Sequence, residues 1–386
     1  MKKKIVETVE KKLDELFEIS KSMYENPEIS NEEFVSSEKL SVFLKKEGFE
    51  VTKPYCDFET GFRAEYKSAK PGPCIAYFCE YDALPGVGHG CGHNLICTMS
   101  VGAGLALKSV LDEIGGRLLI FGTPAEEQSG AKVPYAAKGV FDEVDAALMA
   151  HPSPLSQESG YSLALSPIRF EYTGKAAHAA AQPEKGINAL DAVILLYNGL
   201  NALRQHVPEG TKIHGVITDG GLAPNIVPDF AAANFYFRAT NKKILEDVQN
   251  KALSIAEGAA AMTGATLKWN HFEDPYDDML TNRTLSDAFT ANLKELGETT
   301  VLKPGMGIGS IDMGNVSYRC PAIHPWVGLG DEALVLHSKE FADRTVTDSG
   351  KKALALAAKA LAFTGYDIIT KPELLKAIKA EFEKNR

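Results

Sequence analysis

The apolar residues in the opening part of the chain recur at helical spacing. Between Val6 and Phe17 an apolar residue follows every three or four positions, with charged residues between, which predicts an opening helix. The sequence Ser-Asn-Glu-Glu at 30–33 is typical of a capping box and predicts a second helix that runs to about Lys46. We therefore expect two helices before the first buried strand.

From about residue 75 the pattern changes to short apolar runs separated by longer segments. The runs at 75–79, 118–121 and 146–149 are typical of buried strands, and 95–111 is typical of an apolar helix. Strands that alternate with helices in this way predict a parallel α/β sheet. An Ala- and Lys-rich helix is expected near the end of the chain, from about 348 to 363, and a charged one from Pro372.

A second pattern begins near Leu163 and has the order β-α-β-β-α-β, which is ferredoxin-like. Its elements are expected at 168–172, 188–204, 212–218, 231–238, 243–262 and 266–270. Such a unit closes on itself, and 386 residues are enough for two domains. We predict an open α/β domain with a mixed, mostly parallel sheet at 1–164 and 277–386. An inserted ferredoxin-like α+β domain is predicted at 165–276.

Composition and charge exclude several classes of protein. Apolar residues make up 45% of the chain and charged residues 24%, which is ordinary for a globular protein. The net charge of −10 disfavours nucleic acid and anionic membranes as partners. No uninterrupted apolar run approaches the roughly 18 residues of a membrane helix. Acidic residues soon follow Lys2–Lys4, which leaves no apolar core for a secretory signal, and the six cysteines form no CxxC pair. We therefore expect a cytoplasmic protein.

Four polar clusters lie at or shortly after the ends of predicted buried strands. They are Glu-Tyr-Asp at 80–82, Gly-His-Gly-Cys-Gly-His-Asn at 88–94, Thr-Pro-Ala-Glu-Glu at 123–127 and His-Pro at 151–152. Ligands of open α/β sheets bind at the carboxyl ends of strands, so the clusters are expected to meet at one edge of the sheet.

Each cluster taken alone has an ordinary explanation. Acidic pairs at strand ends are often solvated turns, a glycine-rich stretch can be a turn with a buried cysteine, and a lone His is more often a satisfied core or surface group. Two His and one Cys in so short a stretch are nevertheless unusual for a turn, and Cys91 and His93 are ligands that zinc prefers. Adjacent carboxylates at Glu126 and Glu127 can divide metal binding and proton transfer between them.

Other catalytic signatures are absent from the sequence. There is no HExxH, no GxSxG and no phosphate-binding GxxxxGK[ST] motif. The glycine-rich stretch at 305–310 is a weak signal, which we interpret as a flexible loop near a substrate.

The motifs Glu-Tyr-Asp-Ala-Leu-Pro, Gly-Cys-Gly-His-Asn, Thr-Pro-Ala-Glu-Glu and a His-Pro after a strand resemble, in this order, those of the M20 metallopeptidases. They are most similar to the amidohydrolase branch, subfamily D, which includes aminobenzoyl-glutamate hydrolases, auxin-conjugate hydrolases and M20-domain dipeptidases. The resemblance continues at 174–178, 220–229, 309–312 and 337–341, and so spans nearly the whole chain. It implies a two-metal catalytic domain with an inserted lid and leaves the substrate open.

The resemblance also implies roles for particular residues. It assigns metal binding to Cys91, His93, Glu127, His151 and His337. It makes Glu126 the general base and Asp82 the residue that orients a metal-bound histidine. Many members of the wider family have His-x-Asp where this chain has Glu80-Tyr81-Asp82, so one expected ligand is missing, and Cys-x-His is its candidate replacement. Five ligands are too many for one tetrahedral catalytic site, so we expect two divalent ions, zinc or manganese. His324 is the reserve ligand should His337 lie far away.

The lid is expected to contribute substrate contacts. His178 resembles a lid histidine that reaches the active site of a partner subunit in several relatives, although a polar loop residue is the ordinary alternative. Arg238 closes an alternating strand and is a candidate clamp for a substrate carboxylate, with a surface strand end as its alternative. Asn225 and Ser310 are the other expected substrate contacts.

We expect from these residues a metal-dependent hydrolase of amide bonds in small substrates, namely dipeptides or N-acyl and N-aroyl amino acids, which works as a homodimer through the lid. Two alternatives stay open. One is a cysteine hydrolase that uses Cys91 with His89 or His93, and the other is a non-catalytic two-domain binding protein. A thiol enzyme would survive metal chelation, and pure binding has no need of a base such as Glu126 beside Glu127.

Overall fold

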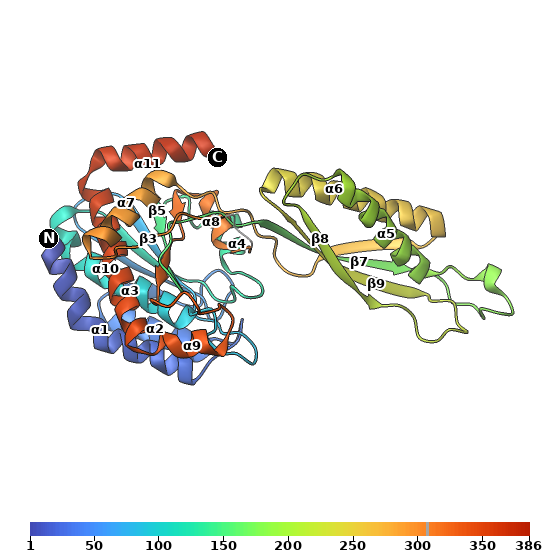
Figure 1. The fold of residues 1–386 in the computed structure, drawn as a ribbon, viewed down its shortest axis with the longest axis horizontal. Coiled ribbons are helices and arrows are strands. Elements are labelled where there is room, and N and C mark those ends of the chain that lie inside the picture. Colours follow the sequence, from blue (N-terminus) through green and yellow to red (C-terminus); the bar gives the residue numbers. More distant parts are fainter. Residues whose placement is uncertain (306–308) are drawn as a thin grey trace. The chain divides into compact units, whose positions relative to one another are not determined.

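The computed structural model describes residues 1–305 and 309–386, so part of the glycine-rich stretch at 305–310 lies outside the described residues. The chain divides into two compact units (Figure 1). The first contains Met1–Tyr161, the segment that starts at Met279, and Asp312–Arg386, and the second contains Ser162–Asp278. The sequence placed residues 309–311 in the catalytic domain, but they belong to the second unit.

The first unit is built on a six-stranded mixed sheet, and its α/β class is confirmed. In spatial order the strands are β1 (Glu50–Thr52), β2 (Phe62–Lys67), β4 (Arg117–Gly122), β3 (Cys74–Cys79), β5 (Ala146–Leu148) and β11 (Ala322–Ile323). The pairs among β4, β3, β5 and β11 are parallel, whereas β1 and β2 pair antiparallel. A separate parallel pair joins β6 (His151–Ser153) to β12 (Trp326–Gly328). The three predicted strands are present as β3, β4 and β5. The pattern did not predict the antiparallel strands β1 and β2 or the short strands β6, β11 and β12.

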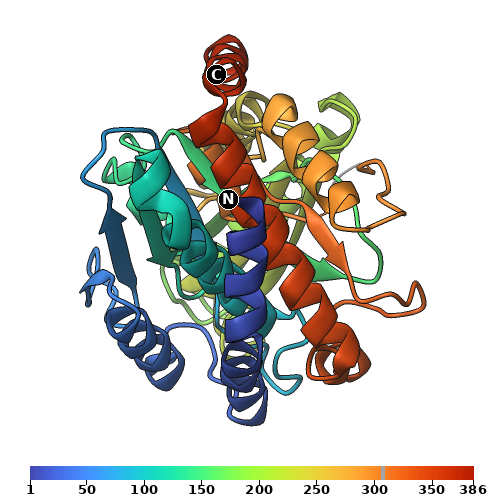
Figure 2. The ribbon, with the colours of Figure 1, turned by 90° about the vertical axis from the view of Figure 1, so that its left-hand side faces the viewer.

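Three long helices form the core of the first unit together with the sheet. The helix α3 (His93–Ile114) packs against β3 and β4, and α1 (Lys2–Glu25) and α10 (Asp348–Thr370) pack against α3 (Figure 2). The remaining helices are α2 (Phe34–Lys46), α4 (Lys132–Ala137), α7 (Arg283–Glu295), α8 (Met313–Ser317), α9 (Lys339–Thr345) and α11 (Pro372–Asn385).

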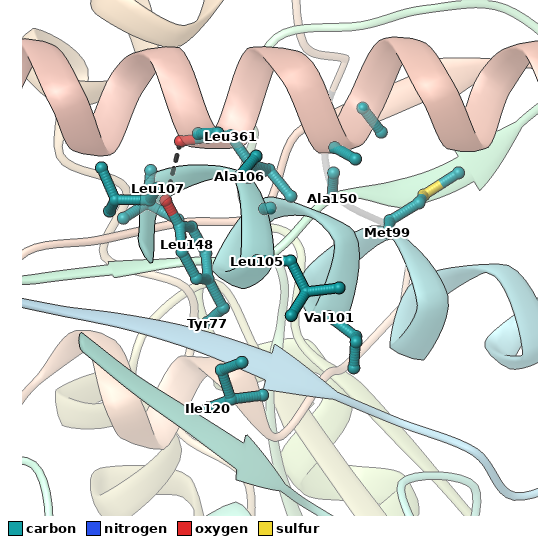
Figure 3. Packing of buried hydrophobic residues seen from close by; sticks show 14 of the residues in the cluster. Tyr77, Met99, Val101, Leu105, Ala106, Leu107, Ile120, Leu148, Ala150 and Leu361 are labelled. Atoms are coloured by element: carbon teal, nitrogen blue, oxygen red, sulfur yellow. Dashed lines mark hydrogen bonds between the residues drawn. The ribbon is translucent and has the colours of Figure 1, made fainter. Parts of the chain in front are cut away.

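Two of these helices, α3 and α10, are long and apolar enough to cross a membrane by length and composition alone. Most of each is buried inside the unit, where such helices form the core of a globular domain. Figure 3 shows their packing: Leu107 of α3 and Leu361 of α10 meet around Tyr77 of β3, whose hydroxyl donates to the Leu361 carbonyl at 3.0 Å. Their apolar character is therefore explained by burial against the sheet.

The predicted capping box at 30–33 is wrong, although the helix that follows it exists. Helix α2 begins at Phe34, and no side chain caps it from the Glu33 position. The Glu28 carboxylate instead accepts from the backbone N–H groups of Val35 and Ser36 at 2.9 and 2.7 Å. Ser30 and Glu33 are used elsewhere, because both side chains bond to residues of the carboxyl edge of the sheet.

The second unit has the ferredoxin-like order that the sequence predicted. Its strands β7 (Ala164–Thr173), β8 (Lys212–Asp219), β9 (Phe230–Ala239) and β10 (Thr266–His271) form an antiparallel sheet in the order β10-β7-β9-β8. The helices α5 (Ala189–Leu203) and α6 (Lys242–Thr263) pack against each other and against β7 and β9, and short 3-10 helices lie at Pro183–Lys185 and Arg204–His206. Strand β8 is left at one edge of the sheet.

Candidate metal centre

The four polar clusters of the sequence converge at the carboxyl edge of the first unit. Three sets of ligand atoms each lie within 4.8 Å of one another. The sets are Cys91 with His93 and His151, Cys91 with Glu127 and His337, and His93 with Glu126 and Glu127. The structure therefore brings all five predicted metal ligands and the predicted base together. Cys91 lies in the loop after β3, His93 begins α3, and Glu126 and Glu127 lie in the loop after β4. His151 begins β6, and His337 directly precedes Ser338, the N-cap of α9.

Two glycines permit this close approach. Gly92 precedes α3 with φ 83°, and a Cβ there would lie 2.5 Å from the Pro152 ring, so only glycine fits between Cys91 and His93. A Cβ at Gly90 would lie 2.7 Å from the Val87 side chain and 3.2 Å from the His337 Cα. The chain around His337 can therefore lie directly on Gly90, whose carbonyl accepts from the His337 N–H at 2.9 Å.

Asp82 orients His93. The Nδ1 of His93 lies 2.9 Å from both Oδ1 and the carbonyl oxygen of Asp82, and a proton shared with them leaves Nε2 to face the cluster. Burial opposes ionisation of Asp82, but the His93 ring, the Glu127 N–H and the Ser30 hydroxyl outweigh burial and hold the pKa at about 2. Asp82 therefore remains a carboxylate and keeps the ring in one orientation.

His151 is fixed in the same way by the backbone. Its Nδ1 lies 2.7 Å from the Pro152 carbonyl, so Nδ1 donates and Nε2 faces Cys91 Sγ at 3.4 Å. The rings of His324 and Trp326 lie 5.5 and 4.5 Å from the ring of His151. Burial lowers the pKa of His324 to about 4, so its imidazole is neutral near pH 7. His324 is therefore an uncharged ring beside the predicted ligand His151.

Two buried atoms show that a cation fits this cluster. Nε2 of His93 and Oε1 of Glu127 are buried, and neither makes a hydrogen bond within the described part of the chain. They lie 3.8 Å apart, too far for a mutual hydrogen bond and suited to a shared ion. Burying a polar group without a partner costs folding free energy. A metal ion is a partner that thiolate, imidazole and carboxylate groups can all bind.

Glu126 and Glu127 stand on a turn with unusual backbone geometry. Ala125 has φ 62°, a left-handed conformation that residues with a Cβ rarely adopt, and the Glu127 N–H donates to Asp82 Oδ2 at 3.0 Å. Burial and the charges of Glu80, Glu127 and Asp312 raise the pKa of Glu126 well above its usual range. A carboxylate with a raised pKa is suited to accept a proton near neutral pH.

A buried lysine beside these carboxylates was not predicted from the sequence. The Lys132 ammonium is fully buried and donates to Glu80 Oε1 at 2.6 Å and to Asp312 Oδ1 at 2.7 Å. Burial opposes its charge, but Asp312, Glu80 and Glu126 outweigh burial and raise the pKa of Lys132. Burial raises the pKa of Asp312 to about 6 although Lys132 acts against this. The sequence around Lys132 does not mark it as buried, because its partners Glu80 and Asp312 lie 52 and 180 positions away.

The lid residues form two groups inside the second unit. His178 is exposed, and its Nδ1 accepts from the N–H groups of Ala180 and Ala181, which leaves Nε2 as a donor. Asn225 lies beside it, because the Asn225 carbonyl accepts from Ala179 N–H at 3.1 Å. At the other end of β9, Arg238 donates to Ser310 Oγ at 2.7 Å.

These two groups lie far apart within one unit. Phe230 at the start of β9 pairs with Thr173, and Arg238 near its end pairs with Leu165. Phe230 and Arg238 are eight positions apart along the strand, which corresponds to about 25 Å. The lid residues predicted to contact the substrate therefore form two separate groups within the lid of one chain.

His89, a partner of Cys91 in the cysteine-hydrolase alternative, is in none of the three ligand sets found among the described residues. Burial lowers its pKa to about 3. Burial also raises the pKa of the Cys91 thiol well above its usual value, whereas a nucleophilic cysteine needs a lowered one. The arrangement thus favours Cys91 as a ligand over Cys91 as a nucleophile.

Comparison with known proteins gives a consistent picture. Residues 167–262 match the M20 family model described as a peptidase dimerisation domain. The chain is 35% identical to the Xaa-Arg dipeptidase of Mus musculus over 99% of this chain and 92% of that protein. It is also 35% identical to one of the subunits of the p-aminobenzoyl-glutamate hydrolase from Escherichia coli, over 72% of this chain and 62% of that protein.

Solved structures share the fold. An aminobenzoyl-glutamate utilization protein from Klebsiella pneumoniae superposes with a TM-score of 0.73 at 20% identity, covering 93% of this chain and 96% of that one. A dinuclear metal-binding peptidase of the M20 family from Bacillus subtilis superposes with a TM-score of 0.68 at 22% identity, covering 93% of this chain and 98% of that one.

Replacing Lys132 tests the charge balance of the site. Lys132→Met leaves the buried carboxylates of Glu80 and Asp312 without their cation, so we expect the free energy of unfolding of the first unit to fall by about 3–5 kcal/mol. Lys138→Met is the matched control, because Lys138 lies at the end of the same helix and pairs with Asp57 in solvent, where an ion pair adds little to stability. Calorimetric melting measures both, and equal melting temperatures would contradict the assigned role.

Proposed function

The chain belongs to the M20 metallopeptidase family, and from that premise we propose that it hydrolyses the amide bond of dipeptides or of N-acyl and N-aroyl amino acids with two divalent metal ions. The observation that carries the proposal is the convergence of a sulfur, three imidazoles and two carboxylates in overlapping sets within 4.8 Å. The relatives are named as a dipeptidase and as an aroyl-glutamate hydrolase, which supports small amides as substrates.

The five predicted ligands divide naturally between two ions. Cys91, His93 and Glu127 each belong to two of the three sets, so the sets overlap and would hold two ions close together. The bound ions supply an acidified water and polarise the scissile carbonyl. Zinc or manganese suits this mixture of sulfur, nitrogen and oxygen ligands.

The protein's own groups carry the proton. Glu126 stands on the turn beside Glu127, with Oε2 3.9 Å from Nε2 of His93, and its raised pKa suits a base that takes a proton from water and gives it to the leaving amine. Asp82 holds the His93 ring in place throughout, because its own pKa is far below that of the base. His178, with Nε2 free to donate, is suited to stabilise the oxyanion.

The lid is suited to bind the carboxylate of the substrate and to pair with a second copy of the chain. Arg238 is a half-buried cation that donates to the neutral hydroxyl of Ser310, and its guanidinium can bind a carboxylate through two N–H groups. Strand β8 lies at the sheet edge within the matched dimerisation domain, and its Val216 and Ile217 are 61% and 44% exposed. An exposed apolar edge strand favours pairing with the same strand of another subunit.

The separation within the lid supports a composite site in which its two ends serve different chains. A dipeptide spans only about 7 Å, whereas about 25 Å separates the Arg238 end of the lid from the end near His178. One lid cannot place both groups on one small substrate. If both act on it, one of them comes from the partner subunit, and the Arg238 end adjoins the chain's own connections to the first unit at 161–162 and 278–279.

Substitution of the two adjacent glutamates separates base from ligand. Glu126→Gln cannot accept a proton, so we expect kcat to fall by at least about 100-fold with metal content unchanged. Glu127→Gln should instead bind metal more weakly, and chelation should abolish the activity of the parent protein. Activity on dipeptides with metal analysis of each variant measures this, and a parent activity that survives chelation would favour the thiol mechanism.

The carboxylate clamp predicts a preference among substrates. A dipeptide whose C-terminus is amidated loses the charged pair with Arg238, so we expect kcat/KM to fall by about 100-fold relative to the free acid. In Arg238→Met the free acid should lose activity while the amide changes little, which removes the preference. Equal rates on acid and amide in the parent protein would rule out the clamp.

Mixing two inactive variants tests the composite site. In a mixed dimer of His178→Ala and Glu126→Gln chains, one of the two sites combines an intact Glu126 with an intact His178 of the other chain. Random exchange should restore about a quarter of the parent activity, since half of the dimers are mixed and half of their sites are intact. Subunit exchange is confirmed with differently tagged chains, and no recovery after exchange would place His178 on its own chain's site or outside catalysis.

A further inference from the structure

The loop between α1 and α2, residues 26–33, bonds to several parts of the metal centre although it contributes no predicted ligand. The Glu28 carbonyl accepts from the Ala83 N–H at 2.8 Å, and the Ser30 hydroxyl donates to Asp82 Oδ2 at 2.8 Å. The Asn31 amide donates to Ser129 Oγ at 3.2 Å. This loop therefore joins the segment after β3 to the segment after β4.

Glu33, the last residue of this loop, makes the most buried of these contacts. Its side chain is fully buried, its Oε1 accepts from the Ala125 N–H at 2.8 Å, and its Oε2 accepts from the Thr60 hydroxyl at 3.0 Å. Ala125 immediately precedes Glu126 and has the left-handed φ of 62°. A residue with a Cβ persists in this conformation when its surroundings hold it there.

The bonds around Ala125 show what Glu33 contributes. The Ala125 carbonyl accepts from the N–H groups of Gln128, Ser129 and Gly130, so the peptide after Ala125 is held by its own turn. The peptide before Ala125 is held at both of its polar groups. The Pro124 carbonyl accepts from the Ala131 N–H at 3.1 Å, and the Ala125 N–H donates to Glu33, which comes from a distant part of the chain. Glu33 thus supplies the one of these two contacts that comes from outside the 124–131 segment, directly before Glu126 and Glu127.

We propose that Glu33 is a positioning residue that fixes the Ala125 turn and so aims Glu126 and Glu127 at the metal centre. The inference rests on the proposed function of Glu126 and Glu127 but concerns a residue outside the ligand and base set. Outer groups that hold ligands in place typically affect metal affinity by about 10–100-fold, and a displacement of about 1 Å can cost about 100-fold in rate.

Three variants separate positioning from simple stability. Glu33→Met keeps the volume but removes both acceptors. Glu33→Gln keeps an oxygen for the Ala125 N–H, and its amide can donate to the Thr60 hydroxyl, so it is the conservative variant. Thr60→Val removes a buried hydrogen bond to the same carboxylate and leaves the bond to Ala125, so it is the matched control for lost stability.

We expect Glu33→Met to lower kcat by at least about 10-fold at saturating metal with little change in KM, and to weaken binding of Mn²⁺ alone by about 10-fold in calorimetry. Glu33→Gln should restore both values to near those of the parent. Thr60→Val should lower the melting temperature but leave kcat and Mn²⁺ affinity unchanged. If Glu33→Met does not fold, Glu33→Asp replaces it, because its carboxylate ends one methylene short of Ala125.

The inference is overturned if Glu33→Met matches Thr60→Val in kcat and in Mn²⁺ affinity, or if Glu33→Gln is as impaired as Glu33→Met. Its failure is distinct from failure of the proposed function. A parent protein without metal-dependent hydrolysis of small amides contradicts the proposed function, and the Mn²⁺ affinities of the same variants still decide the role of Glu33.

Discussion

Mutual repulsion of buried carboxylates is the constraint on which the centre depends. Glu80, Asp82, Glu126, Glu127 and Asp312 gather at the carboxyl edge of one sheet, where low dielectric makes uncompensated charge costly. Lys132 neutralises two of them directly, and His93 is hydrogen-bonded to a third. Glu127 Oε1 faces the unpartnered Nε2 of His93 at 3.8 Å, and a cation bound there would compensate this carboxylate as well.

The same constraint explains why Glu80 is present without being a predicted ligand. The resemblance to the wider M20 family led us to expect a metal-binding histidine at this position, where this chain has Glu80. Here the Lys132 ammonium holds one oxygen of Glu80 at 2.6 Å, and the other lies 3.5 Å from His93 Nε2. A carboxylate tied to a buried lysine is a weaker metal ligand than a free one, and Glu80 is in none of the three ligand sets found among the described residues, whereas Cys91 is in two.

The sequence predicted the elements, and the residues that lie together at the carboxyl edge of the sheet, well because both have local signals. Buried strands are apolar runs, the lid has a recognisable order of elements, and the ligands stand in short motifs at strand ends. Lys132 and Glu33 were missed because their partners are distant. Lys132 pairs with residues 52 and 180 positions away, and Glu33 bonds to a backbone N–H 92 positions away. The capping box failed for the same reason, since tertiary partners outcompeted the local cap for Ser30 and Glu33.

Two turns that present predicted ligands or the predicted base have strained backbone. Ala125 and His337 both have left-handed φ values although neither is glycine, and each lies at or beside a predicted ligand or base. Such conformations need external support, and each has it: Glu33 holds the Ala125 N–H, and the Gly90 carbonyl holds the His337 N–H. The support comes in both cases from another loop of the centre. The loops at this edge therefore hold one another in place. Replacement of a supporting residue is expected to alter the metal centre by displacing the turn that this residue holds, because its own side chain is not a predicted ligand.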